Sequence, residues 1–160
     1  MGNVPDGASS GRKFGRLCFL ISGWPKQSII VVPLRWTCPA IFGKCDSPFG
    51  HGHNYVLEVT VEGPIDQETG MVFDLVALDG LVEKEVLERF DHTNLNLDVE
   101  NFQSRVPTTE NVCVEIFNLL KDKVDSAGPL HAAHLARVRL EETNSNFFEY
   151  EGERSIRSRN

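Results

Sequence analysis

The stretch HNYVLEVTVEGP, residues 53–64, carries the clearest structural signal in the chain. Every second side chain is apolar, at Tyr55, Leu57, Val59 and Val61. Successive side chains on a strand point to opposite faces, so this period of two predicts a strand with one buried face. Gly63 and Pro64 mark its end.

The segments that follow predict a hairpin and then a helix. Residues 66–70 have turn composition, and residues 71–73 are expected to form a short second strand that pairs with the first. Asp74 is placed to cap a helix over residues 75–89. Its expected apolar stripe is Leu75, Leu78, Val82, Val86 and Phe90. The charged residues expected off that stripe are Glu83, Lys84, Glu85 and Glu88.

A second helix is expected after Pro107, where threonine hydroxyls can accept from unpaired amides and Glu110 complements the helix dipole. Its predicted core face is Val112, Cys113, Ile116, Phe117, Leu120 and Val124. Two strands are expected within residues 136–150, around a turn at residues 144–146. Strands grouped at both ends of two helices indicate an α+β fold.

The front of the chain has a weaker pattern. Residues 1–10 have the composition of a disordered lead-in, and the tail at residues 154–160 is polar. Residues 28–34 (SIIVVPL) favour a strand, but Pro33 cannot donate a ladder hydrogen bond, which indicates an edge strand or a strand end.

Composition excludes several classes of protein. A chain of 160 residues with 41% hydrophobic residues is the size of one domain, and it has no apolar run of the roughly 18 residues that span a bilayer. We therefore expect no membrane partner. The formal charge of −7 disfavours nucleic acid as a partner. Four scattered cysteines, without paired spacing, favour a reducing cytoplasm.

The sequence His51-Gly52-His53 carries the most direct chemical signal. On a strand, residues two apart share a face, so both imidazoles could bind one metal ion. Two surface histidines at the mouth of a strand are the alternative. Cys45 lies six residues upstream in CDSPFGHGHNY, and a thiol near a cation would ionise readily and could act as a base.

Other residues have both chemical and purely structural interpretations. Asp91 beside His92 could orient an imidazole for proton transfer, although a histidine at a helix end is also stabilised by the dipole. Only one carboxylate of Glu141-Glu142 can face inward, where it could accept hydrogen bonds from a ligand; two solvated acids are the alternative. His131 and His134 are expected in an exposed linker and remain fallback ligands. We expect Cys113, and also Cys18 and Cys38, to be buried cysteines that fill apolar space in the core.

Five motifs, in this order and spacing, resemble the 6-pyruvoyl-tetrahydropterin synthase family. They are FGKCDSPFGHGHNY at residues 42–55, GPIDQETGMVFDL at 63–75, FDHTNLN at 90–96, PTTEN at 107–111 and LEETNSN at 140–146. The resemblance implies the tetrahydrobiopterin tunnelling fold, with a four-stranded antiparallel sheet, two helices on one face and a barrel assembled from three chains or from two such trimers. We expect the family domain at residues 41–153, after an atypical segment at 1–40 and before the polar tail.

The resemblance also implies a reaction and a set of site residues. Zn²⁺ would be held by His51 and His53, and 7,8-dihydroneopterin triphosphate would lose triphosphate and rearrange to 6-pyruvoyl-tetrahydropterin. Cys45 would accept a proton, Asp91 and His92 would relay protons, and Glu142 would anchor the pterin beside Thr109 and Glu110. The six-residue step from Cys45 to His51 is similar to the pyruvoyl branch; the alternative is the 6-carboxy-tetrahydropterin synthase of queuosine synthesis.

One departure from the family bears on activity. The family has a third zinc histidine in its first strand, within a motif resembling FSASHRL, whereas this chain has no histidine before His51. Three explanations remain open: a substitute thiolate from Cys18 or Cys38, an inactive homologue, or a front segment altered by a frameshift.

Overall fold

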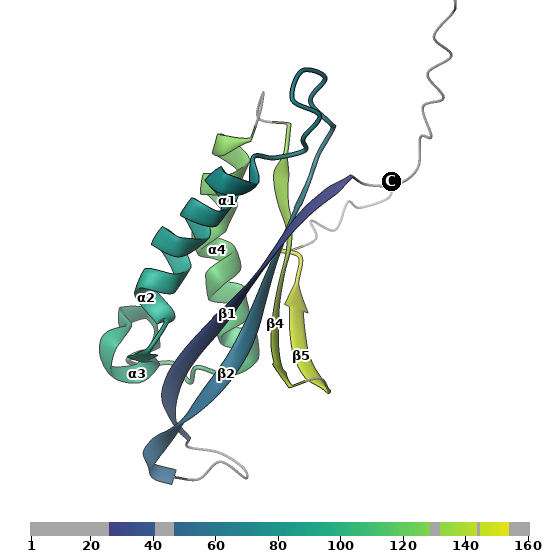
Figure 1. Cartoon of the computed structure of the whole chain (residues 1–160). Coiled ribbons are helices and arrows are strands. Elements are labelled where there is room, and N and C mark those ends of the chain that lie inside the picture. Colours follow the sequence, from purple (N-terminus) through teal and green to yellow (C-terminus); the bar gives the residue numbers. More distant parts are fainter. Residues whose placement is uncertain (1–25, 41–46, 129–131, 144, 154–160) are drawn as a thin grey trace, which may run out of the picture.

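A computed structural model describes residues 26–40, 47–128, 132–143 and 145–153. Its centre is a sheet in the order β3-β1-β2-β4-β5, with the helices packed on one face (Figure 1). The strands are β1 (Gln27–Ala40), β2 (Ser47–Glu62), β3 (Thr93–Asn94), β4 (His134–Thr143) and β5 (Asn146–Tyr150). This arrangement confirms the α+β class.

Two long helical segments cover the sheet. The first runs through α1 (Leu75–Val82), η2 (Glu83–Leu87) and α2 (Glu88–Phe90), and the second is α4 (Thr109–Ala127). Between them lie the short α3 (Leu95–Asp98) and η3 (Glu100–Phe102). Asp74 and Thr108 cap the two long segments by accepting from the amides of Val76 and Asn111. Within the described residues, no helix combines the length and apolarity needed to cross a membrane.

The sheet differs from the expected four antiparallel strands by one short addition. β1, β2, β4 and β5 pair antiparallel, but the two-residue β3 pairs parallel with β1 at Trp36 and Thr37. β3 follows the turn that ends α2, so the sheet gains this strand where the first helical segment returns to the edge of β1.

The prediction that residues 71–73 form a strand paired with β2 was wrong. These residues form no strand, because β2 already has β1 along one edge and β4 along the other. Val72 and Phe73 instead enter the core from a loop. The turn before them is present: the amide of Gly70 donates to the carbonyl of Asp66 at 2.9 Å, and Gly70 has a φ of 73°.

The predicted stripe of the first helix needs two corrections, because Leu75 is 47% exposed and Glu85 is only 4% exposed. The wider π-helical turn at Glu83–Leu87 adds a residue per turn, which keeps Val86 in the core and rotates Glu85 inward. Burial alone would raise the pKa of Glu85, but the hydrogen bond and charge of Lys123, and the charge of Arg89, outweigh it and lower that pKa.

β1 belongs to the core although none of the five sequence motifs lies in it. Leu34 and Trp36 are each 1% exposed, and the Trp36 ring stacks on that of Tyr55 with centroids 3.9 Å apart. Among the described residues, β1 has a neighbour on one side only at Pro33, since the β3 pairing begins three residues later. This confirms the interpretation of Pro33.

Replacing Trp36 with alanine is expected to lower the free energy of unfolding by about 3–5 kcal/mol, because it removes a large buried side chain and leaves a cavity. Val31→Ala is the matched control, since Val31 lies on the same strand and is 59% exposed. Chemical denaturation of both variants measures the difference. Equal effects would mean that β1 is not packed in the core.

Candidate active site

The His51-Gly52-His53 sequence lies within β2, as expected for two ligands on a strand. The ladder between β1 and β2 runs without a register shift from Gln27 to Cys38, and it pairs Trp36 with His53 and Cys38 with His51. Residues 51 and 53 are therefore two steps apart on a regular strand. The side chains of His51 and Cys38 lie outside the described part of the structure, so the convergence of both imidazoles stays a prediction.

Glu142 holds the imidazole of His53. Its Oε1 lies 2.6 Å from Nδ1 of His53, and its Oε2 accepts from the side-chain amide of Asn146 at 2.8 Å. Both His53 and Glu142 are mostly buried, with side chains 22% and 19% exposed. Glu141 instead pairs with Arg139 at 2.7 Å. Glu142 is thus the inward member of the acidic pair.

Asp91 and His92 form a second carboxylate–imidazole pair at the end of α2. Oδ2 of Asp91 lies 2.8 Å from Nδ1 of His92. A carboxylate can only accept, so this contact selects the tautomer in which Nδ1 carries the proton and Nε2 can act as a base. The side chain of His92 is 71% exposed, whereas that of Asp91 is 29% exposed. The Asp91–His92 contact is therefore present, and its role in proton transfer stays a prediction.

One cavity of about 330 Å³ brings the two histidines together. Its walls come from the interior of β1 and β2, from the turn after α2 and from the start of β3. The lining residues are Arg35, Trp36, Thr37, Gly52, His53, Asn54, His92 and Thr93. Two histidines that are distant in sequence, each with a carboxylate on its Nδ1, thus line the same cavity.

Several predicted site residues are not part of this cavity wall. Thr109 and Glu110 open α4 and are not among the lining residues, so their role beside a pterin stays a prediction. Cys45, Cys18 and His131 lie outside the described residues. The expected lead-in at residues 1–10 and the polar tail at residues 154–160 also lie outside them. His134 begins β4 and is exposed.

Cys113 is a core residue, as expected. It is fully buried, and its Sγ lies 3.3 Å from the carbonyl oxygen of Val138. Burial raises the pKa of its thiol to about 12, so Cys113 stays protonated near neutral pH and is unsuited to act as a nucleophile.

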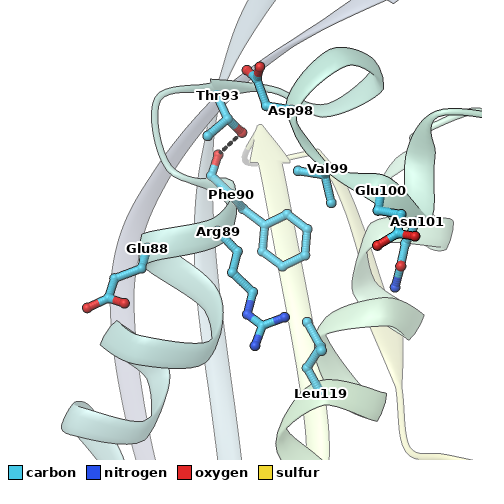
Figure 2. A pocket seen from close by; sticks show the side chains of 9 residues that line it. All are labelled: Glu88, Arg89, Phe90, Thr93, Asp98, Val99, Glu100, Asn101 and Leu119. Carbon is cyan, nitrogen blue, oxygen red and sulfur yellow. Dashed lines mark hydrogen bonds between the residues drawn. The ribbon is translucent and has the colours of Figure 1, made fainter.

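A second cavity, of about 320 Å³, lies beside the same turn but on the helical side of the molecule. Figure 2 shows the Phe90 ring within it and the Thr93 hydroxyl, which donates to the carbonyl of Phe90 at 2.8 Å. Three of its lining residues are acidic, namely Glu88, Asp98 and Glu100. None of the predicted site residues lines this cavity, although Thr93 lines both it and the cavity at His53 and His92.

Comparison with known proteins agrees with these observations. The family model for 6-pyruvoyl tetrahydropterin synthase matches residues 31–153, which include the whole cavity wall. The chain belongs to the 6-pyruvoyl tetrahydropterin synthase family. The match begins inside β1, ten residues before the boundary expected from the motifs.

Known members of the 6-pyruvoyl tetrahydropterin synthase family are similar in sequence and fold. The 6-pyruvoyl tetrahydrobiopterin synthase of Pongo abelii is 46% identical over 113 residues, which cover 71% of this chain and 74% of the relative. The solved Caenorhabditis elegans 6-pyruvoyl tetrahydropterin synthase has a TM-score of 0.69 at 34% identity, covering 81% of this chain and 96% of that one. A putative 6-carboxy-5,6,7,8-tetrahydropterin synthase of Archaeoglobus fulgidus is 37% identical over 99 residues, 62% of this chain and 73% of the relative.

Sequence reasoning missed the part of the site that β1 contributes. Arg35, Trp36 and Thr37 line the cavity, yet they lie in a segment without a family motif. The signal that could have found them was the strand-forming run before them. Extending that strand to its pairing with His51 and His53 would have placed residues 35–37 beside the histidines.

Proposed function

We propose that this chain is a lyase that converts 7,8-dihydroneopterin triphosphate to 6-pyruvoyl-tetrahydropterin with loss of triphosphate. The observation that carries the proposal is the shared cavity, in which His53, with Glu142 on its Nδ1, lies with His92, with Asp91 on its Nδ1. The relatives named as 6-pyruvoyl tetrahydrobiopterin synthases support the substrate assignment.

The Asp91–His92 pair would move protons during the rearrangement of the substrate side chain. With Nδ1 donating to Asp91, Nε2 of His92 would take up a proton at the cavity, and Asp91 would stabilise the imidazolium that results. Cys45, predicted from the motif, would be the first proton acceptor. Each group would return the proton it takes up to another atom of the bound molecule, so that the internal rearrangement needs no external oxidant or reductant.

The donor set around His53 fits a zinc site. Metal-binding histidines commonly donate their other ring nitrogen to a carboxylate, which fixes the ring and makes the ligating nitrogen more basic. Glu142 makes this contact with Nδ1 of His53, which assigns Nε2 as the ligating atom. Bound Zn²⁺ would polarise a substrate oxygen and acidify the neighbouring C–H group. No three described His, Cys, Asp or Glu side chains form a metal cluster, and the side chain of His51 is not among those described.

The missing third histidine has one candidate replacement at a suitable backbone position. β1 pairs Cys38 with His51, whereas Cys18 lies outside the described residues. Zinc accepts thiolate as readily as imidazole. We therefore favour Cys38 over Cys18 as a substitute ligand.

The role of Glu142 as pterin anchor is compatible with its contact to His53. Both of its oxygens already accept hydrogen bonds, one from His53 and one from Asn146. A carboxylate oxygen has more than one lone pair, so Glu142 could also accept from the pterin ring while it orients His53.

We also propose that the chain works as a homo-oligomer, a trimer or a hexamer. The sheet face turned away from the helices carries exposed apolar side chains on three strands: Ile29, Val31, Val56 and Phe147, each 41–59% exposed. An apolar surface of this kind is typical of an interface.

Product analysis tests the proposed function. The purified chain, loaded with zinc and given 7,8-dihydroneopterin triphosphate, is expected to release triphosphate and 6-pyruvoyl-tetrahydropterin. Formation of 6-carboxy-tetrahydropterin would assign the chain to the alternative branch, which the archaeal relative represents. A folded, zinc-loaded chain that forms neither product would be an inactive homologue.

A further inference from the structure

The backbone of β1 holds both members of the Asp91–His92 pair. The amide of Arg35 donates to Oδ1 of Asp91 at 2.8 Å, and the amide of His92 donates to the carbonyl of Arg35 at 2.6 Å. Asp91 therefore binds a fixed main-chain donor through one oxygen and the imidazole of His92 through the other.

His92 adopts a conformation that needs such support. Its φ is 58°, in the left-handed region that residues with a Cβ rarely adopt. Positions of this kind persist where the surroundings hold them in place. Here the amide of His92 is bonded to Arg35 and its ring to Asp91, so both ends of the residue are fixed.

The orientation of β1 makes Arg35 available for this contact. In an antiparallel strand the N–H and C=O of one residue point to the same side, and the next residue points to the other. Both groups of Arg35 point to the Asp91–His92 turn and hence away from β2. Pro33 and Val31 share this orientation, since they lie two and four residues before Arg35.

We propose that the peptide group of Arg35 is a positioning element for the Asp91–His92 pair, so that β1 completes the active site. The expected effect on catalysis rests on the proposed function, whereas the positioning of Asp91 and His92 by Arg35 does not. The amide of Arg35 fixes the carboxylate, the carboxylate fixes the imidazole tautomer, and the carbonyl of Arg35 fixes the backbone of His92. Arg35 thus acts through Asp91 and His92.

Arg35→Pro tests the proposal, because it removes the N–H donor while sparing the hydrogen bonds between β1 and β2. Arg35→Ala is the reference: it removes the same side chain and keeps the amide. Val31→Pro is the matched control for a proline on the same side of the same strand, where Pro33 is already tolerated.

Two readouts separate this proposal from the proposed function. Relative to Arg35→Ala, Arg35→Pro is expected to lower kcat about tenfold with KM changed less than about twofold, the loss typical of one charge-assisted hydrogen bond. It is also expected to speed hydrogen exchange of the His92 amide about tenfold, a measurement that needs no activity. Val31→Pro is expected to leave the exchange rate of the His92 amide unchanged.

Equal kcat and equal His92 exchange in Arg35→Pro and Arg35→Ala would overturn the proposal. The same holds if Val31→Pro speeds the exchange as much as Arg35→Pro. Faster exchange in Arg35→Pro alone, in a chain without lyase activity, would support the positioning role and count against the proposed function.

Discussion

Replacing His92 with alanine is expected to lower kcat about 100-fold or more, with little change in the thermal stability of the protein. The side chain of His92 is 71% exposed, so its removal leaves no cavity in the core. The substitution removes the imidazole that Asp91 orients at the cavity, and with it the proposed proton-transfer group. Steady-state kinetics with the pterin triphosphate, together with thermal unfolding, measure both effects.

His134 provides the matched control for this prediction. It is another exposed histidine of the same chain, and it pairs in register with Glu62, at the end of β2 far from His53. His134→Ala is expected to retain full activity. If His92→Ala keeps more than about a third of the parent kcat, His92 is not the proton-transfer group.

Replacing His53 with alanine is expected to reduce bound zinc from about one per chain to near zero and to abolish turnover. His53 has a carboxylate on Nδ1 and a position in the cavity wall, and its side chain is only 22% exposed, whereas that of His92 is 71% exposed. Elemental analysis of protein dialysed against a known zinc concentration measures the loss. Zinc content unchanged in His53→Ala would contradict the assignment.

Two further variants refine the metal assignment. Glu142→Gln is expected to weaken zinc binding about 10- to 100-fold, the effect usual for a carboxylate that orients a ligating histidine. Cys38→Ser tests the substitute ligand in the same assay. A fall in zinc content would assign Cys38 to the site, and an unchanged content would exclude it.

Much of the fold could be predicted from the sequence where one local signal was sufficient. The alternation at residues 55–61 predicted the buried face of β2, and the six apolar positions predicted for α4 are all buried. Asp74 and Thr108 cap their helices as expected from their side chains. In these segments packing and local propensity favour the same structure.

The predictions were wrong where contacts between distant parts of the chain determine the local structure. Residues 71–73 have strand composition, but both edges of β2 were already taken by strands distant in sequence. Glu85 is turned inward by a π-helical turn and is stabilised there by Lys123 from α4, at 3.1 Å. Neither the competing strand nor the distant lysine is visible in a local pattern.

The site was predictable in its residue types but not in all its connections. Spacing and motif identified His53, Asp91, His92 and Glu142. The structure places His53 and His92 in one cavity wall, with Glu142 bonded to His53 and Asp91 bonded to His92. The contribution of Arg35 comes from its main chain. Any residue except proline can supply that amide, so no side-chain motif marks the position.

The most direct test of the account is the location of zinc in crystals of the metal-loaded chain, measured by anomalous diffraction at the zinc absorption edge. We predict one strong peak at the cavity between β1, β2 and the Asp91–His92 turn, about 2.0–2.1 Å from Nε2 of His53. A zinc-loaded crystal with its peak elsewhere, or with the imidazole of His53 turned away from the metal, would contradict it.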